Sequence, residues 1–466
     1  MKIAEPAVKP PLDPGFQPAI LFENAYRAAV ADAGASESLD LVVARPDGAA
    51  WAERLELLPG AERDSDTWRF LERRVKFLLW QKGGSRLHVA GSPVWAERLR
   101  SCYSPEGDRA FDAAFMGGRI FAGPFEVIAG DRTDSPQEGE HSVELGGHLD
   151  GNRIGFDLGG SDRKSAAVID GEVVFSEEIA WDPYFQSDPE YHREGIRDSL
   201  RRAAAHLPRV DAIGGSAAGV YINNEVRAGS LFRGLSEDAF NRSIRGFFQE
   251  LEQEWGVPVA IANDGEVAAL ASSLSTHKAG ILGLSLGTST AAGYVRPSGK
   301  LTVWLNELAF VPIDYREDAP VDEWSGDRGC GAQYFSQQAV ARLAPAAGMV
   351  PGSGEKAPDL LVRVQKAMEA GDAHARAIYE TIGVYLGYAL LHWCEQYDLN
   401  YLQLLGRVMS GPGGDLIWET AGTVFAAENP KIGDRLNFLE VDERTKRHGQ
   451  AIAAASLPAL AGNHQP

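Results

Sequence analysis

The segment RIGFDLGGSDRKSAAVI, residues 153–169, combines residue types that could bind a phosphate. Two short apolar pieces flank a turn that carries Asp157, Gly159 and Gly160, and two cations follow. Backbone N–H groups approach phosphate oxygens closely where glycine leaves no Cβ in the way. Taken alone, the pattern is equally typical of a β-hairpin whose glycines only make the turn.

The same pattern returns later in the chain. IGFDLGGSDRKSAAVIDGEVVFSEE (154–178) and LGLSLGTSTAAGYVRPSGKLTVWLN (282–306) each consist of strand, glycine-rich turn, strand, glycine turn and strand. Two related three-stranded units predict two lobes of like fold that face each other across a cleft. We expect the two turns to hold the phosphates of one ligand from opposite sides, through Gly159, Gly160, Ser161 and Lys164 in the first turn and Gly287, Thr288 and Ser289 in the second.

The acid in the first turn needs a different role, because a carboxylate and a phosphate repel each other. We expect Asp157 to hold Mg²⁺, through water, since Mg²⁺ favours carboxylates near phosphates and keeps much of its hydration shell. Lys164 or Arg163 could offset charge on the transferring group. The alternative is that Asp162, Arg163 and Lys164 form a solvated turn.

A second acid lies in VPVAIANDGEVAALASSL, residues 257–274, where a buried strand runs into an alanine-rich helix. A carboxylate at the carboxyl end of such a strand opens into the cleft of an open α/β sheet. Asp264 could therefore accept a proton from an attacking hydroxyl, and Asn263 could orient that hydroxyl. The alternative is that Asp264 only caps the helix.

A third glycine-rich turn lies in YLQLLGRVMSGPGGDLIWETA, residues 401–421, between a strand and a helix. Backbone without a Cβ can approach a flat ligand such as adenine or ribose. The residues that would contact the nucleoside are Gly406, Arg407, Ser410 and Gly411.

The elements that must position these turns belong to an α/β protein. Short β-branched runs alternate with amphipathic helices after residue 150. The 466 residues are enough for two or three domains, and a net charge of −20 argues against partners such as nucleic acid or an anionic membrane. Three widely spaced cysteines, without a CxxC pair or an apolar leader, predict a cytoplasmic protein.

Changes in amino-acid composition along the chain predict three units. Residues 1–150 form an N-terminal α+β extension, with a proline-rich, loosely held arm at 1–16 and a polar linker at 131–150. Residues 151–275 form the first lobe and residues 276–466 the second. The pentapeptide WAERL occurs at 51–55 and 95–99, which we interpret as a coincidence between two amphipathic helix fragments.

FDLGGSDRK, IANDGEVAAL, LSLGTSTAAGYV and LLGRVMSG, in this order, resemble the sugar kinases of the actin/hexokinase/heat-shock-chaperone ATPase fold. The ROK family (repressors, uncharacterised reading frames and kinases) is the most similar, over roughly residues 150–460. The resemblance implies two ribonuclease-H-like lobes, ATP and Mg²⁺ as cofactors, and a homodimer. It also implies a glucokinase-like transferase that phosphorylates a hexose, with Asp264 as the base and Asn263 and Glu307 as sugar ligands.

The chain departs from the family where many members carry a cysteine-rich zinc loop. Cys330 is alone there, and Phe310 stands in place of a histidine, so we predict no zinc site. Ala332 and Gln333 stand where a second sugar-binding glutamate is expected, and Gln333 could substitute for it. These departures keep two alternatives open: a non-catalytic sugar-sensing regulator, and a different ATPase of the same fold.

Overall fold

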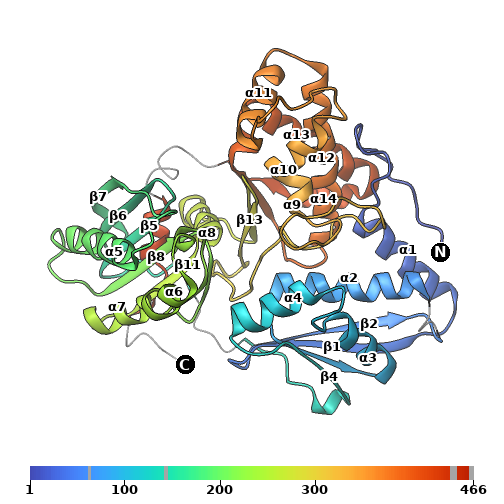
Figure 1. The fold of residues 1–466 in the computed structure, drawn as a ribbon, viewed down its shortest axis with the longest axis horizontal. Helices are drawn as coiled ribbons and strands as arrows, with labels where there is room; N and C mark the ends of the chain where they lie inside the picture. Colours follow the sequence, from blue (N-terminus) through green and yellow to red (C-terminus); the bar gives the residue numbers. More distant parts are fainter. Residues whose placement is uncertain (61–63, 141–144, 441–448, 461–466) are drawn as a thin grey trace.

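The computed structural model describes residues 1–60, 64–140, 145–440 and 449–460. They form an N-terminal α+β domain and two α/β lobes (Figure 1). Each lobe is built on its own sheet, and the strand order of the first sheet is that of a ribonuclease-H-like lobe. The predicted fold class, two such lobes with an extra N-terminal domain, is confirmed.

The N-terminal domain has one mixed sheet, ordered β2-β1-β3-β4. Its long helix α2 starts at an aspartate cap, where the Asp64 carboxylate accepts a hydrogen bond from the Thr67 N–H at 2.6 Å. The elements are α1 Ala19–Asp32, β1 Glu37–Ala44, β2 Ala50–Leu57, α2 Ser65–Lys82, β3 Arg86–Ala90, α3 Pro93–Cys102, α4 Ala110–Ala114, the π-helix η1 Phe115–Phe121, β4 Glu126–Gly130 and the 3-10 helix η2 Arg132–Asp134.

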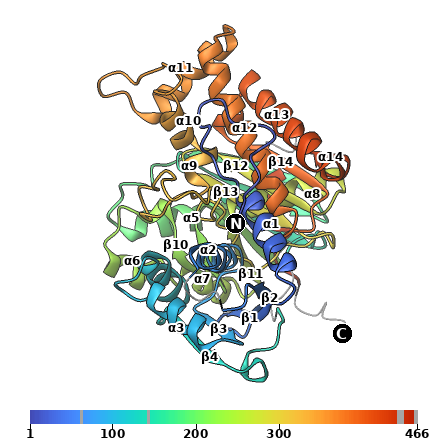
Figure 2. The same ribbon diagram turned by 90° about the vertical axis from the view of Figure 1, so that its right-hand side faces the viewer.

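This domain shares one apolar core with the second lobe. Figure 2 shows α2 end-on between the sheet of the domain and the helices of the second lobe. The proline-rich arm, predicted to be loosely held, is packed instead: the Val8 N–H donates to the Tyr388 hydroxyl, and Asp13 forms salt bridges with Arg316 and Arg342. Burial of apolar surface against the second lobe explains why these residues are ordered.

The first lobe has a five-stranded sheet, ordered β11-β8-β5-β6-β7. Strands β5, β8 and β11 are parallel, so their carboxyl ends meet at one edge. The elements are β5 Asn152–Leu158, β6 Asp162–Ile169, β7 Glu172–Ala180, α5 Pro189–Ala204, β8 Ala212–Ala217, β9 Val220–Ile222, β10 Glu225–Ala228, η3 Ser230–Phe232, α6 Glu237–Ser243, α7 Phe247–Trp255, β11 Val259–Asn263 and α8 Asp264–Thr276.

The second lobe has a four-stranded sheet, ordered β13-β12-β14-β15, with a helical layer above it in Figure 1. In the described part of the chain, no helix is both long and apolar enough to cross a membrane. The elements are β12 Ile281–Leu286, β13 Thr290–Val295, α9 Ala332–Phe335, α10 Gln337–Leu343, α11 Ala357–Glu369, α12 Ala373–Trp393, β14 Tyr401–Leu405, η4 Arg407–Met409, α13 Pro412–Glu428, α14 Pro430–Arg435 and β15 Asn437–Phe438.

The second copy of the hairpin lacks the third strand that the sequence pattern predicts. In the first copy β7 pairs with β6 along its length, whereas in the second only an isolated bridge joins Val295 to Leu301. The chain then leaves the sheet because α2 holds it: the N–H groups of Asn306 and Glu307 donate to the carbonyls of Gln81 and Trp80. A competing partner from the N-terminal domain thus replaces the expected strand pairing.

The last described helix, α15 (Gln450–Ala455), returns to the first lobe, although the interval predicted for the second lobe includes it. It packs on β5 and β8, where Gly155 and Gly214 leave room for its backbone: a Cβ at Gly155 would lie 1.8 Å from the Ala451 carbonyl oxygen. The predicted linker is also partly packed, since the Glu140 carboxylate accepts hydrogen bonds from the indole N–H groups of Trp51 and Trp304. Residues 141–144 of that linker lie outside the described residues.

Candidate functional site

The parallel strands of the first lobe bring Asp157 and Asp264 to the same edge. Register aligns Asp157 with Ser216 and aligns Ala217 with Asn263, the residue before Asp264. The Ser216 hydroxyl donates to one oxygen of the Asp157 carboxylate at 2.7 Å. Asp157 is therefore oriented by its neighbouring strand and keeps one carboxylate oxygen for another partner.

Asp264 has the electrostatic setting of a proton acceptor. Burial raises its pKa to about 6, and the nearby Asp157 carboxylate adds to the rise. Burial also raises the pKa of Asp157. Asp264 lines a small cavity of about 100 Å³ together with Ser285 and Ala291 of the second lobe, so this residue lies at the junction of the two lobes. A carboxyl that titrates near neutral pH is suited to general-base work.

The helix cap is Asn263 rather than Asp264. The Asn263 side-chain oxygen accepts from the Gly265 N–H at 2.8 Å, and its amide donates to the Gly219 carbonyl at 2.8 Å. Asp264 is the first residue of α8, so its carboxylate is not needed as the cap. The side-chain oxygen of Asn263, the predicted sugar ligand, thus caps α8 with one lone pair and can accept a further hydrogen bond with the other.

Glu307 reaches the same region from the second lobe. Burial raises its pKa to about 7, and the next cause is the negative charge of Asp264. The preceding residue, Asn306, has a left-handed backbone with φ of 51°. Glu307 donates its own N–H to the Trp80 carbonyl at 3.0 Å, so the end of α2 places this carboxyl beside Asp264.

A fourth carboxyl of the site, that of Glu266, was not identified from the sequence. Burial raises its pKa to about 8; a hydrogen bond with Asn306 opposes the rise, and the charge of Glu307 adds to it. The only sequence signal was its place on the first turn of the helix that Asp264 opens. Asp264, Glu266 and Glu307 form a chain of interacting carboxyls at the meeting point of both lobes.

The first predicted phosphate turn is a tight hairpin. The Gly159 N–H donates to the Asp162 carbonyl at 2.9 Å, so this group is used within the turn. Ser161 donates its hydroxyl to the Asp162 carboxylate, and Lys164 lies 3.5 Å from that carboxylate. A Cβ at Gly160 would lie 2.1 Å from the Tyr184 hydroxyl, which explains glycine there.

The second predicted phosphate turn leaves its hydroxyl residues open. The Gly287 N–H donates to the Ser289 carbonyl, and the Gly287 carbonyl accepts from Gln337. Thr288 and Ser289 are exposed at the tip. Because the N–H groups of both Gly159 and Gly287 are used inside their turns, an anion would be bound by the neighbouring residues of each turn.

The predicted nucleoside turn lies directly beside the second phosphate turn. Gly406 has a φ of 95°, and a Cβ there would lie 2.5 Å from the Leu286 carbonyl oxygen. The next residues carry the turn into α13: Arg407 lies in η4, its carbonyl accepts from Gln365, Ser410 ends η4, and Gly411 (φ of 73°) precedes α13.

The side chain of Gln333 has a hydrogen-bond partner within the second lobe. Its side-chain amide donates to the Gln338 oxygen at 2.7 Å within neighbouring helices, and the side chain is buried. Phe310, three residues after Glu307, packs against Trp80, with ring centroids 4.3 Å apart and ring planes inclined by 30°. The substitution by Gln333 stays a prediction, because Gln338 engages only one of the two amide hydrogens of Gln333.

An ion-pair cluster occupies the region where the family resemblance suggested a zinc loop. Asp327 forms salt bridges with Arg109, with Lys76 at 3.1 Å and with Arg73 at 3.4 Å, all from the N-terminal domain. These cations hold the pKa of Asp327 well below its usual value, although burial opposes them. Cys330 donates its thiol to the same carboxylate. Among the described residues, no group of three or more His, Cys, Asp or Glu side chains is arranged to hold a metal ion.

The comparisons agree with this fold. A glucokinase from Halalkalibacterium halodurans is 26% identical over 305 residues, which cover 61% of this chain and 88% of that protein. The ROK hexokinase of Thermus thermophilus has a TM-score of 0.51 and 20% identity, covering 65% of this chain and 97% of that one. A ROK transcriptional regulator, a homologue of the Escherichia coli MLC protein, has a TM-score of 0.51 and 19% identity, covering 66% and 79%. No family model matches the chain.

The chain thus has the two-lobed ATPase fold of the ROK proteins, and the resemblance predicted from its motifs is confirmed. Sequence similarity to a curated glucokinase supports the prediction of a carbohydrate kinase. About a third of the chain lies outside these likenesses, and the N-terminal domain is the large unit that the motifs did not cover.

Proposed function

We propose that this protein is an ATP-dependent sugar kinase that transfers the γ-phosphate of ATP to a hydroxyl of a hexose such as glucose. The observation that carries the proposal is the setting of Asp264. Its carboxyl lies at the carboxyl end of β11, interacts with Asp157 of the first lobe and Glu307 of the second, and titrates near pH 6.

Asp264 would accept the proton of the attacking sugar hydroxyl. Glu307, beside it, would accept a hydrogen bond from a second hydroxyl and so orient the ring. Asn263 would keep the start of α8 in place through its bonds to Gly265 and Gly219. Closure of the two lobes would exclude the water that otherwise competes with the sugar.

The residues present fit ATP with Mg²⁺. The free oxygen of Asp157 is of the kind that Mg²⁺ prefers, directly or through water. The exposed hydroxyls of Thr288 and Ser289 are donors for phosphate oxygens, and the turn from Gly406 to Gly411 lies next to them. Bound ATP·Mg²⁺ would supply the phosphoryl group and neutralise its charge. The predicted use of Lys164 stays a proposal, because its ammonium lies near Asp162.

A panel of hexoses with ATP·Mg²⁺, followed by ADP release, tests the proposal. At least one sugar should be a good acceptor, and Asp264→Asn should lower its rate of phosphorylation by about a thousandfold. A rate that stays within threefold in this variant would contradict the role of Asp264.

The alternative of a non-catalytic sugar sensor has one observation in its favour, namely the engagement of Gln333 by Gln338 where a second sugar ligand was expected. Thermal stabilisation by a sugar without any turnover would favour this alternative. ATP hydrolysis without sugar binding would instead favour a different ATPase of the same fold.

A further inference from the structure

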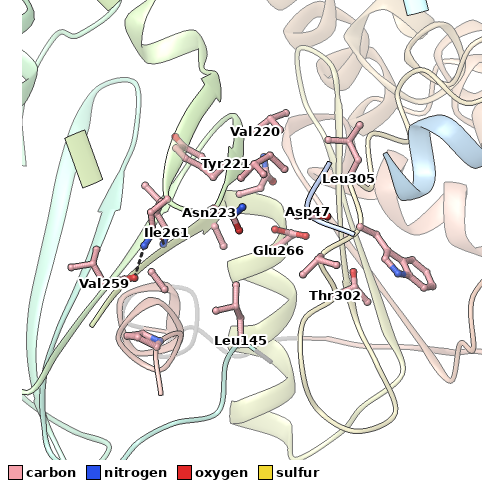
Figure 3. Close-up of a pocket in the computed structure, with 18 of the residues that line it drawn as sticks. Asp47, Leu145, Val220, Tyr221, Asn223, Val259, Ile261, Glu266, Thr302 and Leu305 are labelled. Atoms are coloured by element: carbon pink, nitrogen blue, oxygen red, sulfur yellow. Dashed lines mark hydrogen bonds between the residues drawn. The ribbon is translucent and has the colours of Figure 1, made fainter. Parts of the chain in front are cut away.

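A large pocket lies where all three units meet. Its volume is about 550 Å³, within the range of pockets that enclose ligands larger than a single sugar ring. Figure 3 shows its walls: Val220, Tyr221 and Asn223 of the β9–β10 hairpin, Thr302 and Leu305 of the second lobe, and Asp47 of the N-terminal domain.

The pocket adjoins the proposed phosphoryl-transfer site. Asn263 and Glu266, which line it, flank Asp264 on both sides in sequence. Glu266 interacts electrostatically with Glu307, which interacts with Asp264. A ligand whose reacting hydroxyl lies at Asp264 could therefore extend into this pocket.

The N-terminal domain supplies a rigid part of the wall. The Arg45 side chain is buried, donates to the carbonyls of Lys82 and Gly83, and lies over the ring of Trp51 at 4.9 Å. Within the described ranges it forms no salt bridge. Since Arg45 and Asp47 belong to the turn between β1 and β2, this turn is fixed against the end of α2.

The N-terminal domain also contacts the opposite wall. Its π-helix η1 packs against β10, and Arg119 of η1 lies 5.4 Å from the ring of Phe240. The same domain shares its core with the second lobe. The N-terminal domain thus contacts both the first-lobe wall and the second-lobe wall of the pocket.

The lining favours a neutral ligand rich in hydroxyl groups. The lining carries the carboxylates of Asp47 and Glu252 and one guanidinium, that of Arg45, which already donates to backbone carbonyls, so an anionic ligand would find no free cation there. Carboxylates and amides are suited to sugar hydroxyls. The side-chain amide of Asn223 has no hydrogen-bond partner among the described residues, and it points toward the open space that Glu266 also faces (Figure 3).

Apolar walls complete this chemistry. Val220, Tyr221, Ile261, Trp304 and Leu305 line the pocket beside the polar groups. Sugar rings combine polar edges with C–H faces, and a mixed wall of aromatic and polar side chains can contact both.

We propose that this pocket is a second acceptor subsite, completed by the N-terminal domain, which binds the additional sugar unit of a neutral disaccharide or glycoside. The inference rests on the proposed function, since it places the reacting hydroxyl of that acceptor at Asp264. The N-terminal domain then determines the size of the acceptor.

Titration calorimetry and ADP release, with glucose, maltose, cellobiose, gentiobiose and methyl glucosides as probes, test the inference. At least one disaccharide or glycoside should bind the wild-type chain at least tenfold more tightly than glucose. The double variant Asp47→Ala, Asn223→Gly should weaken that binding at least tenfold and change glucose binding less than twofold. Both side chains are exposed, and glycine is compatible with the left-handed φ of 52° at position 223, so the variant should fold.

Asp131→Ala is the matched control, because Asp131 is an exposed aspartate of the same domain that does not line the pocket. Equal weakening of glucose and disaccharide by the double variant, or no disaccharide or glycoside binding more tightly than glucose, would overturn the subsite. Tighter binding of a glucuronide than of the neutral glycoside would also overturn it. Disaccharide binding that depends on Asp47 and Asn223, without any phosphorylation, would instead overturn the proposed kinase function and leave the subsite standing.

Discussion

The two copies of the glycine hairpin diverge after their second strand. In the first copy, β7 continues the sheet by pairing with β6. In the second, residues 302–307 leave the sheet and hydrogen-bond to the carbonyl end of α2, which brings Glu307 beside Asp264. The same local pattern thus gives a structural strand in one lobe and a segment of the candidate site in the other, because the N-terminal domain shares its core with the second lobe.

The two copies also differ in how closely a helix packs against the first strand of each. Gly155 of β5 is in contact with the backbone of α15, whereas a Cβ at the corresponding Gly283 of β12 would lie 3.1 Å from the Ala269 Cβ. The close helix contact therefore lies on the first strand in the first copy, whereas in the second copy it lies on the second strand, where a Cβ at Gly293 of β13 would lie 2.3 Å from the Gly265 carbonyl oxygen of α8.

The largest expected effect comes from removing the proposed base. Asp264→Asn should lower kcat for the best hexose by about a thousandfold, because general-base catalysis contributes on this order. ADP release measures the rate. Asp170→Asn, in the glycine turn of the first copy, is the control and should leave kcat within twofold, since asparagine tolerates the left-handed φ of 49° at this position.

The second prediction concerns the contacts that hold the region after each hairpin. Asp327→Asn should lower the free energy of unfolding by about 3 kcal/mol at pH 7, because it removes the one buried carboxylate that pairs with all three of Lys76, Arg73 and Arg109. Glu72 and Asp112 then remain as their buried counter-charges. Glu177→Gln, which breaks the surface pair with Arg202 on β7, should cost less than about 1 kcal/mol. Urea unfolding measures both.

The pH dependence of stability tests the role of the Asp327 ion pairs further. The pKa of Asp327 is depressed in the folded protein, so its contribution is present above the unfolded pKa and is lost as the pH falls. The stability difference between wild type and Asp327→Asn should therefore shrink from pH 7 to pH 3. A difference that is independent of pH would contradict the ion-pair explanation.

A third pair of variants tests the covering of the two sheets. Gly155→Ala should lower the free energy of unfolding by about 2 kcal/mol, since the new methyl group would collide with the backbone of α15. Gly283→Ala should cost less than about 1 kcal/mol, because only a side-chain methyl group has to yield. Equal losses in thermal unfolding would show that α15 does not pack as described.

The smallest expected effect concerns Glu266. Its folded pKa of about 8 lies above the ordinary value of a glutamate, so the folded state favours the neutral carboxyl and loses stability as the pH rises from about 5 to 8. Glu266→Gln should therefore increase the free energy of unfolding at pH 8, by on the order of 1 kcal/mol because solvent screens this half-buried carboxyl, and change it little at pH 5. Chemical unfolding at the two pH values measures this, and an equal effect at both would argue against a buried neutral Glu266.

Local patterns predicted the parts of the site that are local. The strand–turn–strand around Gly159 and around Gly287, and the strand–helix junction at Asp264, follow from residues adjacent in the chain. The prediction of a third strand in the second copy was wrong. A strand needs a neighbouring strand as its hydrogen-bond partner, and here the carbonyl groups at the end of α2 accept the hydrogen bonds instead. Glu266 was missed, since the residues next to it in the sequence do not indicate that Asn306 and Glu307 lie near it in the folded chain.

The pentapeptide WAERL illustrates the same limit. Residues 51–55 lie in strand β2 and residues 95–99 in helix α3, although both were interpreted as helix fragments. At 51–55 the pairing with β1 decides the conformation, and at 95–99 the Ser92 cap and Pro93 begin a helix.

The two-lobed fold, the glycine turns and the acid after β11 could be predicted from the amino-acid sequence, because they depend on backbone freedom and on hydrophobic patterns within short segments. Which carboxyls lie near Asp264, how the N-terminal domain closes the large pocket, and how Asp327 is neutralised became visible in the folded chain alone. Those outcomes depend on contacts between residues far apart in the chain, and the burial that shifts their pKa values exists only once the three units have packed together.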